Sequence, residues 1–428
     1  MIIRDPVHGL IELAGPAGPV LHELLDTREV QRLRRIRQLG IASLSFPGAE
    51  HSRFGHALGT AHVMARLCDR LQRQDGAPAR LEPELVAAAV AAALLHDVGH
   101  PPLSHVLETA VPGGQAHERW SVAVAESGET EVGAALLGHG LSSAVADLLA
   151  GVHEARFLCD ALSSPLDVDR FDYLLRDSHY SGAHYGMFDL DWMLSSLRLA
   201  EAPTPDGTRV VLAVDGRRGL RAVEAYLMAR LSMFQQVYFH KTGRAAEFML
   251  RRVLARAGAL IEDGAARLGP IPSGLSSLLR GQKPSLHDYL DLDDTVIWSC
   301  LRRWADCDDP VLARLAGGLL HRRLLRTLPL QRALAGTEEE QVVLARVREA
   351  TLAAGYDPDH FCGLDRAVDV AYNVDPGSPE RIWVVGLGGP RPLAEVSPIV
   401  HVLRGWQVGR TIVICPREAR DTLIGELE

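Results

Sequence analysis

Residues 85–105 read LVAAAVAAALLHDVGHPPLSH, and this stretch decides the fold of the chain around it. Leu85 to Leu95 are apolar without interruption, which predicts a buried helix, and Pro83 suits the first turn of that helix. His96 and Asp97 follow directly, so a rigid helix end would hold an imidazole and a carboxylate side by side. A capped helix end with a solvated His and Asp explains the dipeptide equally well when it is taken alone.

Two further signatures flank this stretch, HSRFGH at residues 51–56 and DVDRFDYLLRD at residues 167–177. Each has an ordinary structural explanation, a core histidine in the first and a charged helix face in the second. Asp167 and Asp172 fit that charged face. Taken together, the signatures supply two imidazoles and two carboxylates: His56, His96, Asp97 and Asp169. This mixed N/O shell suits Mn, Fe, Zn, Ni or Mg, and the ion could supply hydroxide at neutral pH and polarise a phosphoryl oxygen.

Other polar residues surround the expected ligands. Histidines beside a metal-bound phosphate ester are natural proton donors to a leaving oxygen, and glutamates can orient them. The candidates are His100, His105, Glu108, His117 and Glu118, with Glu108 one helical turn after His105. Guanidinium groups match phosphate oxygens, although each arginine could equally form a surface ion pair. The candidate phosphate contacts are Arg53, Arg170 and Arg230. Tyr173 and Asp177, one turn apart, could line a sugar pocket.

The composition is that of an ordinary soluble globular protein. Of 428 residues, 47% are hydrophobic and 23% charged, and the net charge of −9 argues against a dedicated polyanion-binding protein. Six cysteines without a CxxC pair indicate reduced thiols. There is no secretory signal, and Leu85–Leu95 is too short to cross about 30 Å of hydrocarbon. We therefore expect a cytoplasmic protein with no membrane partner.

The residue pattern predicts a mainly α fold with short β-hairpins and a small α+β C-terminal portion. Hairpins are expected within residues 1–14 and around 209–216. The expected helices cover residues 20–39, 54–74, 83–97, 117–127, 131–137, 141–151, 167–181, 217–240, 241–263 and much of 289–354. The expected C-terminal strands are 368–372, 381–385 and 411–414. We divide the chain into a core at 1–263, a loop or boundary at 264–288, and an extension at 289–428.

In this order, the three signatures resemble those of the HD-domain phosphohydrolases. The likeness is to the dNTP triphosphohydrolase branch, which includes the sterile-alpha-motif-and-HD-domain protein and its bacterial relatives. It covers about residues 2–260 and includes residues 3–9, 26–27, 31–40, 46–49 and 238–241. Beyond residue 260 only Ser397–Val400 looks similar. The resemblance implies an HD-domain helical bundle, and the sterile alpha motif itself is absent.

Carried over by position, the resemblance gives each candidate a role. The metal ligands would be His56, His96, Asp97 and Asp169, and the catalytic histidines His100, His105 and His117, with Glu108 and Glu118 as partners. The phosphate contacts would be Arg53, Arg170 and Arg230, and the sugar contacts Gln38, Tyr173, Asp177 and Tyr238. The implied reaction is attack of a metal-activated water on the α-phosphorus of a dNTP. His105 would protonate the departing 5′ oxygen, giving deoxynucleoside and inorganic triphosphate.

Some positions depart from the family pattern. Arg170 stands where the best-known member has Lys, and Phe239 replaces a Gln near the substrate. Asp26 and Arg34 match residues that recognise a guanine base at a regulatory nucleotide site, whereas Met1 and Arg4 do not match the phosphate-binding residues there. We expect a nucleotide substrate and a homo-oligomer, either a dimer or a tetramer.

Two alternatives stay open. One is a phosphodiesterase, or a hydrolase of a dinucleoside polyphosphate or signalling nucleotide, in which His100, His105 or His117 would bind a second metal. The other is a nucleotide or nucleic-acid sensor, supported only by the basic run at residues 32–37. An ion-paired helix face explains that run as well.

Overall fold

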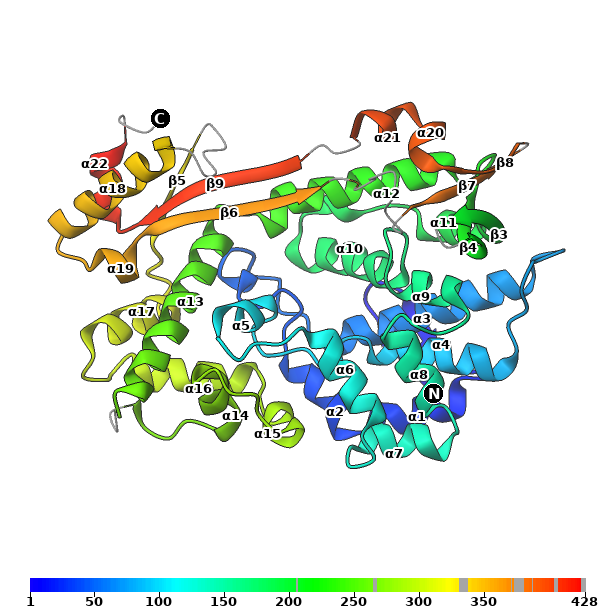
Figure 1. The fold of residues 1–428 in the computed structure, drawn as a ribbon, viewed down its shortest axis with the longest axis horizontal. Helices are drawn as coiled ribbons and strands as arrows, with labels where there is room; N and C mark the ends of the chain where they lie inside the picture. The colour runs from blue at the N-terminus through cyan, green and yellow to red at the C-terminus, as the bar shows by residue number, and fades with distance from the viewer. Residues whose placement is uncertain are drawn as a thin grey trace.

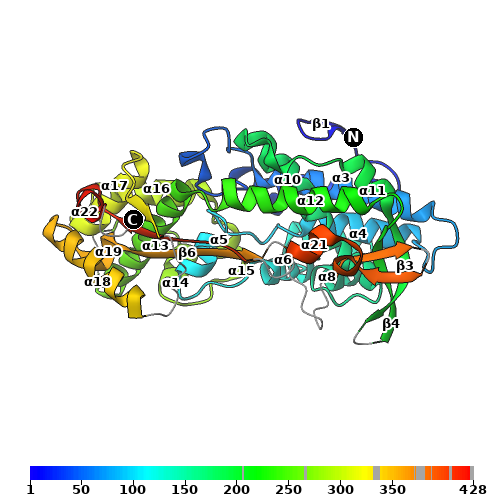
Figure 2. The same ribbon diagram turned by 90° about the horizontal axis from the view of Figure 1, so that it is seen from above.

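The computed structural model describes residues 1–204, 207–264, 268–330, 338–370, 372, 381–386, 388–403 and 407–424. Helices dominate, so the predicted mainly α fold is confirmed. Two helical lobes lie side by side, and a two-stranded ribbon of β6 (Gly363–Val370) and β9 (Gln407–Cys415) runs from the second lobe toward the first (Figure 1). From above the molecule is elongated, with β3 and β4 at one end and α18 and α22 at the other (Figure 2).

The first lobe is built around the helix that the alanine-rich stretch predicts. α4 (Pro83–Leu95) is buried from Val86 to Leu95, and it packs against α3 (Arg53–Gln72) and α8 (Ser142–Leu149). A helix that is apolar all round belongs in the middle of a core. α10 (Val168–Ser181) packs on α3. It begins after Asp167, whose side chain accepts from the Arg170 amide, and ends at Gly182 with φ of 74°.

The other helices of this lobe are α1 (Gly18–Asp26), α2 (Arg28–Arg32), α5 (His105–Ala110), α6 (His117–Glu126), α7 (Glu131–Gly138), α9 (Arg156–Leu162), α11 (Leu190–Ser196) and α12 (Leu220–Met233). Of these, α5, α9 and α11 were not predicted from the sequence. The prediction of a single helix over residues 20–39 is wrong, because the helix is interrupted at Thr27. The backbone of Thr27 is extended, and its hydroxyl donates to the Leu24 carbonyl at 2.6 Å.

Two small sheets belong to the first lobe. β1 (Ile2–Asp5) and β2 (Gly9–Glu12) form the expected hairpin, with Ile3 opposite Ile11. β3 (Leu197–Thr204) and β4 (Gly207–Asp215) form the second hairpin. β7 (Trp383–Gly386) adds parallel to β4, and β8 (Gly389–Pro392) completes the order β3-β4-β7-β8. Two strands from the C-terminal portion, β7 and β8, therefore return to the first lobe.

The second lobe follows a π-helical turn at Phe234–Tyr238. Its long helix is α13 (Lys241–Glu262), and its sheet has the order β5-β9-β6. The loop expected at 264–288 contains two helices, and β5 (Arg326–Pro329) interrupts the stretch expected to be helical. The other helices of the second lobe are α14 (Ser273–Leu279), α15 (Leu286–Leu290), α16 (Asp294–Trp304), α17 (Pro310–Leu320), α18 (Glu338–Ala353), α19 (Pro358–Phe361) and α22 (Arg417–Leu423). α20 (Leu393–Val396) and α21 (Pro398–Leu403) follow β8 and pack against the core of the first lobe (Figure 1).

Within the described ranges, none of the helices combines the length and the apolar character needed to cross a membrane.

Candidate metal centre and active site

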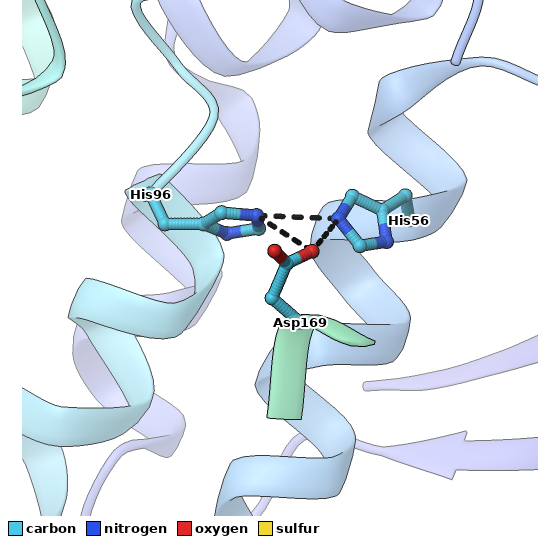
Figure 3. A group of neighbouring side chains, drawn as sticks. All are labelled: His56, His96 and Asp169. Atoms are coloured by element: carbon cyan, nitrogen blue, oxygen red, sulfur yellow. Dashed lines mark hydrogen bonds and ion pairs between the residues drawn. The ribbon is translucent and has the colours of Figure 1, made fainter. Parts of the chain in front are cut away.

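Ligand atoms from three helices converge in the first lobe (Figure 3). His56 lies in the first turn of α3, His96 follows α4 directly, and Asp169 lies in the first turn of α10. His56 Nε2 is 3.2 Å from His96 Nε2 and 3.0 Å from Asp169 Oδ1, and His96 Nε2 is 3.6 Å from that oxygen. Asp97 adds a carboxylate whose Oδ1 lies 3.5 Å from His96 Nε2. The structure thus brings together the four residues expected as ligands.

These spacings fit one ion. Two ligand atoms about 2.1 Å from an ion lie about 3.0 Å apart at a right angle and about 3.4 Å apart at the tetrahedral angle. The three distances among His56, His96 and Asp169 span 3.0–3.6 Å. Two facing imidazole nitrogens and two carboxylates also form the donor set that a divalent transition metal prefers. The residues present therefore fit a divalent metal.

Asp172 orients His56 by a hydrogen bond on the side of the ring away from the candidate ion. His56 Nδ1 donates to Asp172 Oδ2 at 2.7 Å, and His8 Nε2 donates to Asp172 Oδ1 at 2.7 Å. A carboxylate only accepts, so Nδ1 carries a proton and Nε2 faces the candidate ion. Burial disfavours the charged ring, but the carboxylates of Asp169 and Asp172 outweigh it and raise the pKa of His56 to about 10. A metal must therefore displace a proton from His56 Nε2.

The same carboxylate is locked into a buried ionic network. Arg176 donates to both oxygens of Asp172, at 2.8 and 2.9 Å, and to Asp5 Oδ2 at 2.9 Å. α3 comes this close to α10 because residue 59 is glycine. A Cβ at Gly59 would lie 1.8 Å from Asp172 Oδ1 and 2.4 Å from Arg176 Nη2. The N-terminal hairpin therefore reaches the metal ligand through Asp5, Arg176 and Asp172.

Asp97 is fixed from the opposite side by Arg53. One Arg53 nitrogen donates to Asp97 Oδ2, and the other donates to Ser104 Oγ at 3.0 Å. Burial alone would raise the pKa of Asp97, but Arg53 and the nearby histidines hold it well below its usual range. Arg53, expected to bind phosphate, is thus partly engaged with a ligand carboxylate.

A second group of polar residues adjoins the first. Asp97, His100 and His117 offer ligand atoms within 4.8 Å of one another, and the two imidazole rings stack at 4.1 Å. His117 Nδ1 donates to Glu108 Oε1 at 2.8 Å and lies 3.5 Å from Glu118 Oε2. Burial opposes protonation of His117, but Glu108 and Asp97 raise its pKa. The side chain of His105 lies outside the described residues, and Glu108, expected to orient it, contacts His117.

The expected substrate residues mostly line one cavity of about 600 Å³. It is lined by Gln38, Arg53, Asp97, His100, His117, Glu118, Asp169, Arg170, Tyr173, Asp177 and Tyr238, among others. Tyr238 donates its hydroxyl to Asp177 Oδ2 at 2.8 Å, and His51 Nε2 donates to Asp177 Oδ1 at 2.8 Å. Phe239 also lines the cavity. Asp97 and Asp169 of the metal group therefore line the same cavity as the candidate sugar contacts.

Three of the predicted arginines have other close neighbours. Arg170 forms an ion pair with Asp167, and that carboxylate raises the arginine's pKa. The Arg230 guanidinium lies 5.0 Å over the Phe234 ring and is not among the described residues that line the cavity. Arg34 donates to Gln31 Oε1 at 2.8 Å, and its guanidinium lies 3.6 Å over Phe54.

The proposed regulatory residues lie at the surface. Asp26, at the end of α1, is exposed, as is Arg34. Within the basic run, Arg32 is buried and donates to the Leu292 carbonyl at 2.8 Å, while Arg35 pairs with Asp293 at 2.5 Å. Arg37 pairs with Glu50, so contacts within the protein account for most of the run.

Several residues of the site were not predicted. Asp172, assigned to a charged face, is buried and orients His56. Its spacing carried a signal, because Asp172 lies one helical turn after Asp169 and one before Arg176. Asp5, His8 and Gly59 gave no comparable sign, because their contacts with α10 depend on tertiary packing.

The comparisons with known proteins agree with this geometry. The HD domain family matches residues 53–176, and the HD associated region matches residues 195–268. The chain is 33% identical to the Bacillus subtilis protein YwfO over 411 residues, covering 94% of this chain and 89% of that one. It is 30% identical to the human deoxynucleoside triphosphate triphosphohydrolase SAMHD1 over 295 residues, covering 61% of this chain and 45% of that one.

A solved structure extends the likeness to the whole fold. The crystal structure of a phosphohydrolase from Bacteroides thetaiotaomicron superposes with a TM-score of 0.81 at 28% identity, covering 97% of this chain and all of the other. Fold and site together define a helical hydrolase of phosphate compounds. The chain belongs to the HD-domain phosphohydrolases, and it carries the HD-associated region as well.

Proposed function

We propose that this protein is a metal-dependent dNTP triphosphohydrolase. The observation that carries the proposal is the shared cavity, which is lined by Asp97 and Asp169 of the metal group and by Tyr173, Asp177 and Tyr238. Its volume of about 600 Å³ lies in the range of small-molecule sites. Similarity to SAMHD1, a deoxynucleoside triphosphate triphosphohydrolase by name, adds support. The products would be deoxynucleoside and inorganic triphosphate.

Each group of residues in the site would have its own role in the reaction. A divalent ion held by His56, His96, Asp97 and Asp169 would supply an activated water and neutralise phosphate charge. Arg53 orients Asp97 and, with Arg170, gives the cavity positive charge for phosphate oxygens. Arg230, which is not among the described residues that line the cavity, would add positive charge from behind the lining residues. His105 would donate a proton to the leaving 5′ oxygen, with His100, His117, Glu108 and Glu118 forming its polar surroundings.

Sugar recognition would fall to Gln38, Tyr173, Asp177 and Tyr238, which line the same cavity. Tyr238 and Asp177 are held by their mutual hydrogen bond, so their polar atoms are oriented before a ligand arrives. Gln38 lines the same cavity, and its Oε1 has no hydrogen-bond partner among the described residues. Such an oxygen is suited to accept a hydrogen bond from a hydroxyl group of the substrate.

The test is a nucleotide panel with product identification. Purified protein would be incubated with Mn²⁺ or Mg²⁺ and each dNTP, with and without GTP or dGTP. Release of inorganic triphosphate is expected, whereas release of only orthophosphate or pyrophosphate, or no turnover, would reject the proposal.

A dependence on GTP that Asp26→Ala and Arg34→Ala abolish would support the regulatory site. An Asp97→Ala variant should lose bound metal and dNTP hydrolysis. Unaltered function in that variant would favour the nucleotide or nucleic-acid sensor.

One observation favours a second candidate, an HD-type phosphodiesterase or a hydrolase of a dinucleoside polyphosphate or signalling nucleotide. Asp97, His100 and His117 form a second ligand group beside the first, and Asp97 Oδ1 lies 3.7 Å from His117 Nε2. Two-metal sites hold their ions about 3.5–4 Å apart. Elemental analysis separates the candidates, because the dNTP reaction as proposed needs one ion per chain.

We also infer assembly into a dimer or tetramer. Analytical ultracentrifugation with and without GTP tests this inference, and a monomer at every concentration would reject it.

A further inference from the structure

The loop that carries the HD dipeptide is held by side chains from distant parts of the chain. Tyr289 donates its hydroxyl to the Gly99 carbonyl at 2.7 Å, and the Gly99 amide donates to Ser121 Oγ at 3.0 Å. Arg32 Nη1 donates to the Val98 carbonyl at 3.3 Å. Tyr289 lies on α15, outside both segments matched by the family models.

The end of this loop adopts an unfavourable backbone conformation. Leu103 and Ser104 have φ of 58° and 57°, and neither is glycine. Side chains with a Cβ rarely occupy this region, so two consecutive residues persist there only when their surroundings enforce it. α5 begins at the next residue, His105, and carries Glu108. The direction in which α5 leaves the loop is therefore set by this turn.

The Asp294 carboxylate is hydrogen-bonded to the turn. Its Oδ1 accepts from the Leu103 amide at 2.8 Å, and its Oδ2 accepts from the Arg37 amide at 2.9 Å. The residue is 3% exposed, and burial raises the pKa of its carboxyl. Arg53 and the Ser104 hydroxyl add hydrogen bonds on the other side of the turn.

Asp294 is not needed to begin its own helix. The N-cap of α16 is Asp293, whose side chain accepts from the Thr295 amide at 2.9 Å and the Val296 amide at 3.3 Å. The two neighbouring aspartates therefore have separate tasks. One caps α16, and the other binds two amides near the metal site.

We propose that Asp294, assisted by Tyr289, is a positioning residue for the active site: it holds the left-handed turn at Leu103–Ser104 and thereby places α5, so that Glu108 meets His117. The catalytic part of this proposal rests on the proposed function, because His117, Glu108 and His105 are assigned their roles there. The structural part, that the second lobe fixes the loop after the HD dipeptide, stands independently.

The test compares Asp294→Asn with Asp293→Asn. Each substitution removes one negative charge at the start of α16. Only Asp294→Asn leaves a single accepting oxygen for the two amides of Leu103 and Arg37, which now have one carboxylate oxygen each. We expect hydrogen–deuterium exchange in residues 103–110 to be at least about tenfold faster in Asp294→Asn and unchanged in Asp293→Asn. Bound metal, measured by elemental analysis, should stay as in the parent protein.

Kinetics of dNTP hydrolysis supply the second readout. In Asp294→Asn kcat should fall about 10- to 100-fold while KM changes by less than about threefold, because substrate binding is retained and the proton-transfer residues are displaced. Asp293→Asn should keep the parental kcat. If Asp294→Asn does not fold, Tyr289→Phe replaces it, since it removes only a hydroxyl; faster exchange is then expected in residues 97–104.

The outcomes are distinct. Unchanged exchange at the loop in a folded Asp294→Asn protein, or equal effects of both aspartate substitutions, would overturn the proposal. Faster exchange with unaltered kcat would overturn the positioning role. If no dNTP is hydrolysed by the parent protein, the proposed function fails, and the exchange comparison still decides whether Asp294 holds the loop.

Discussion

His56 and Asp172 form a hydrogen bond of 2.7 Å between Nδ1 and Oδ2, and this bond directs the other ring nitrogen of His56 at the candidate metal. A carboxylate that accepts from one nitrogen of a ligating histidine fixes the tautomer and the ring orientation. It also makes the other nitrogen a more basic ligand for the metal. Here the carboxylate is itself held by Arg176 and by His8. The ligand is therefore placed by a buried chain of charges that ends at the N-terminal hairpin.

Replacement of Asp172 by Asn should weaken metal binding. The amide has one accepting oxygen where the carboxylate has two, so it cannot accept from His56, His8 and both Arg176 nitrogens. Removal of an outer-shell carboxylate typically costs about 10- to 100-fold in metal affinity. Isothermal titration of the metal-free protein with Mn²⁺ measures the change. Asp189→Asn is the control, because Asp189 caps α11 without touching the site. Equal affinity in both variants would contradict the assigned role of Asp172.

Gly59→Ala should destabilise the protein. The added Cβ would lie 1.8 Å from Asp172 Oδ1, so α3 and α10 must move apart. Overpacking of this kind costs about 1–3 kcal/mol, and disturbance of the buried ion pair adds to that. Urea unfolding measures the loss. The matched control is Gly55→Ala one turn earlier, where the nearest group is Arg176 Nη1 at 3.4 Å; it should be neutral or slightly stabilising.

Metal should stabilise the folded chain. An ion that binds only the native state at about 100 times its Kd adds about 2.7 kcal/mol to the free energy of unfolding. Thermal unfolding with EDTA and then with added Mn²⁺ should therefore show a rise in Tm. His96→Gln should abolish that rise while leaving the Tm in EDTA close to the parental value. A rise of equal size in His96→Gln would place the stabilising ion elsewhere.

Acid should destabilise the hairpin side of this lobe through His62. Burial, together with His8 and Arg66, lowers the pKa of His62 to about 4, against about 6.5 in the unfolded chain. The unfolded state binds the proton first, so stability is lost as the pH falls from about 6.5 to about 4. After discounting for partial exposure of the ring, we expect about 1–2 kcal/mol. Urea unfolding of His62→Gln across this range should show a flatter pH dependence; an identical slope would refute the assignment.

Tyr238→Phe should lower kcat/KM for dNTP hydrolysis by about 10-fold, with most of the effect in KM. The variant removes the hydroxyl that donates to Asp177 Oδ2 at 2.8 Å, and a hydrogen bond to a charged group contributes about 1.5–3 kcal/mol. The comparison is Tyr185→Phe, an exposed tyrosine that does not line the cavity. Similar kinetics in the two variants would exclude Tyr238 from substrate binding.

Local patterns predicted most of the helices of the first lobe. The apolar run before His96 required a buried helix, and Asp167 and Gly182 mark the two ends of α10 because a cap and a positive φ are local requirements. The break at Thr27 and the strand β5 were missed. The break at Thr27 accompanies a local side-chain hydrogen bond to the Leu24 carbonyl, which competes with the helix. β5 depends on a distant partner, because it pairs with β9 far along the chain.

The candidate site could be predicted as far as its residue types. His56, His96, Asp97 and Asp169 carry their chemistry in the side chain, so a sequence motif can reveal them. Asp172 and Asp294 look like ordinary helical aspartates, because their roles depend on which helix lies behind them. The glycine at position 59 is visible in the sequence, but the carboxylate it makes room for comes from α10.

The ion pair between Asp5 and Arg176 links residues far apart in the order of synthesis. The hairpin is made before α10, yet the buried Asp5 carboxylate lacks its positively charged partner until α10 has emerged and docked. Contacts of such long sequence separation form late and slow folding. Metal capture should accordingly be one of the last steps of maturation, and a nascent chain ending before Arg176 should neither retain an ion nor protect the hairpin from proteases.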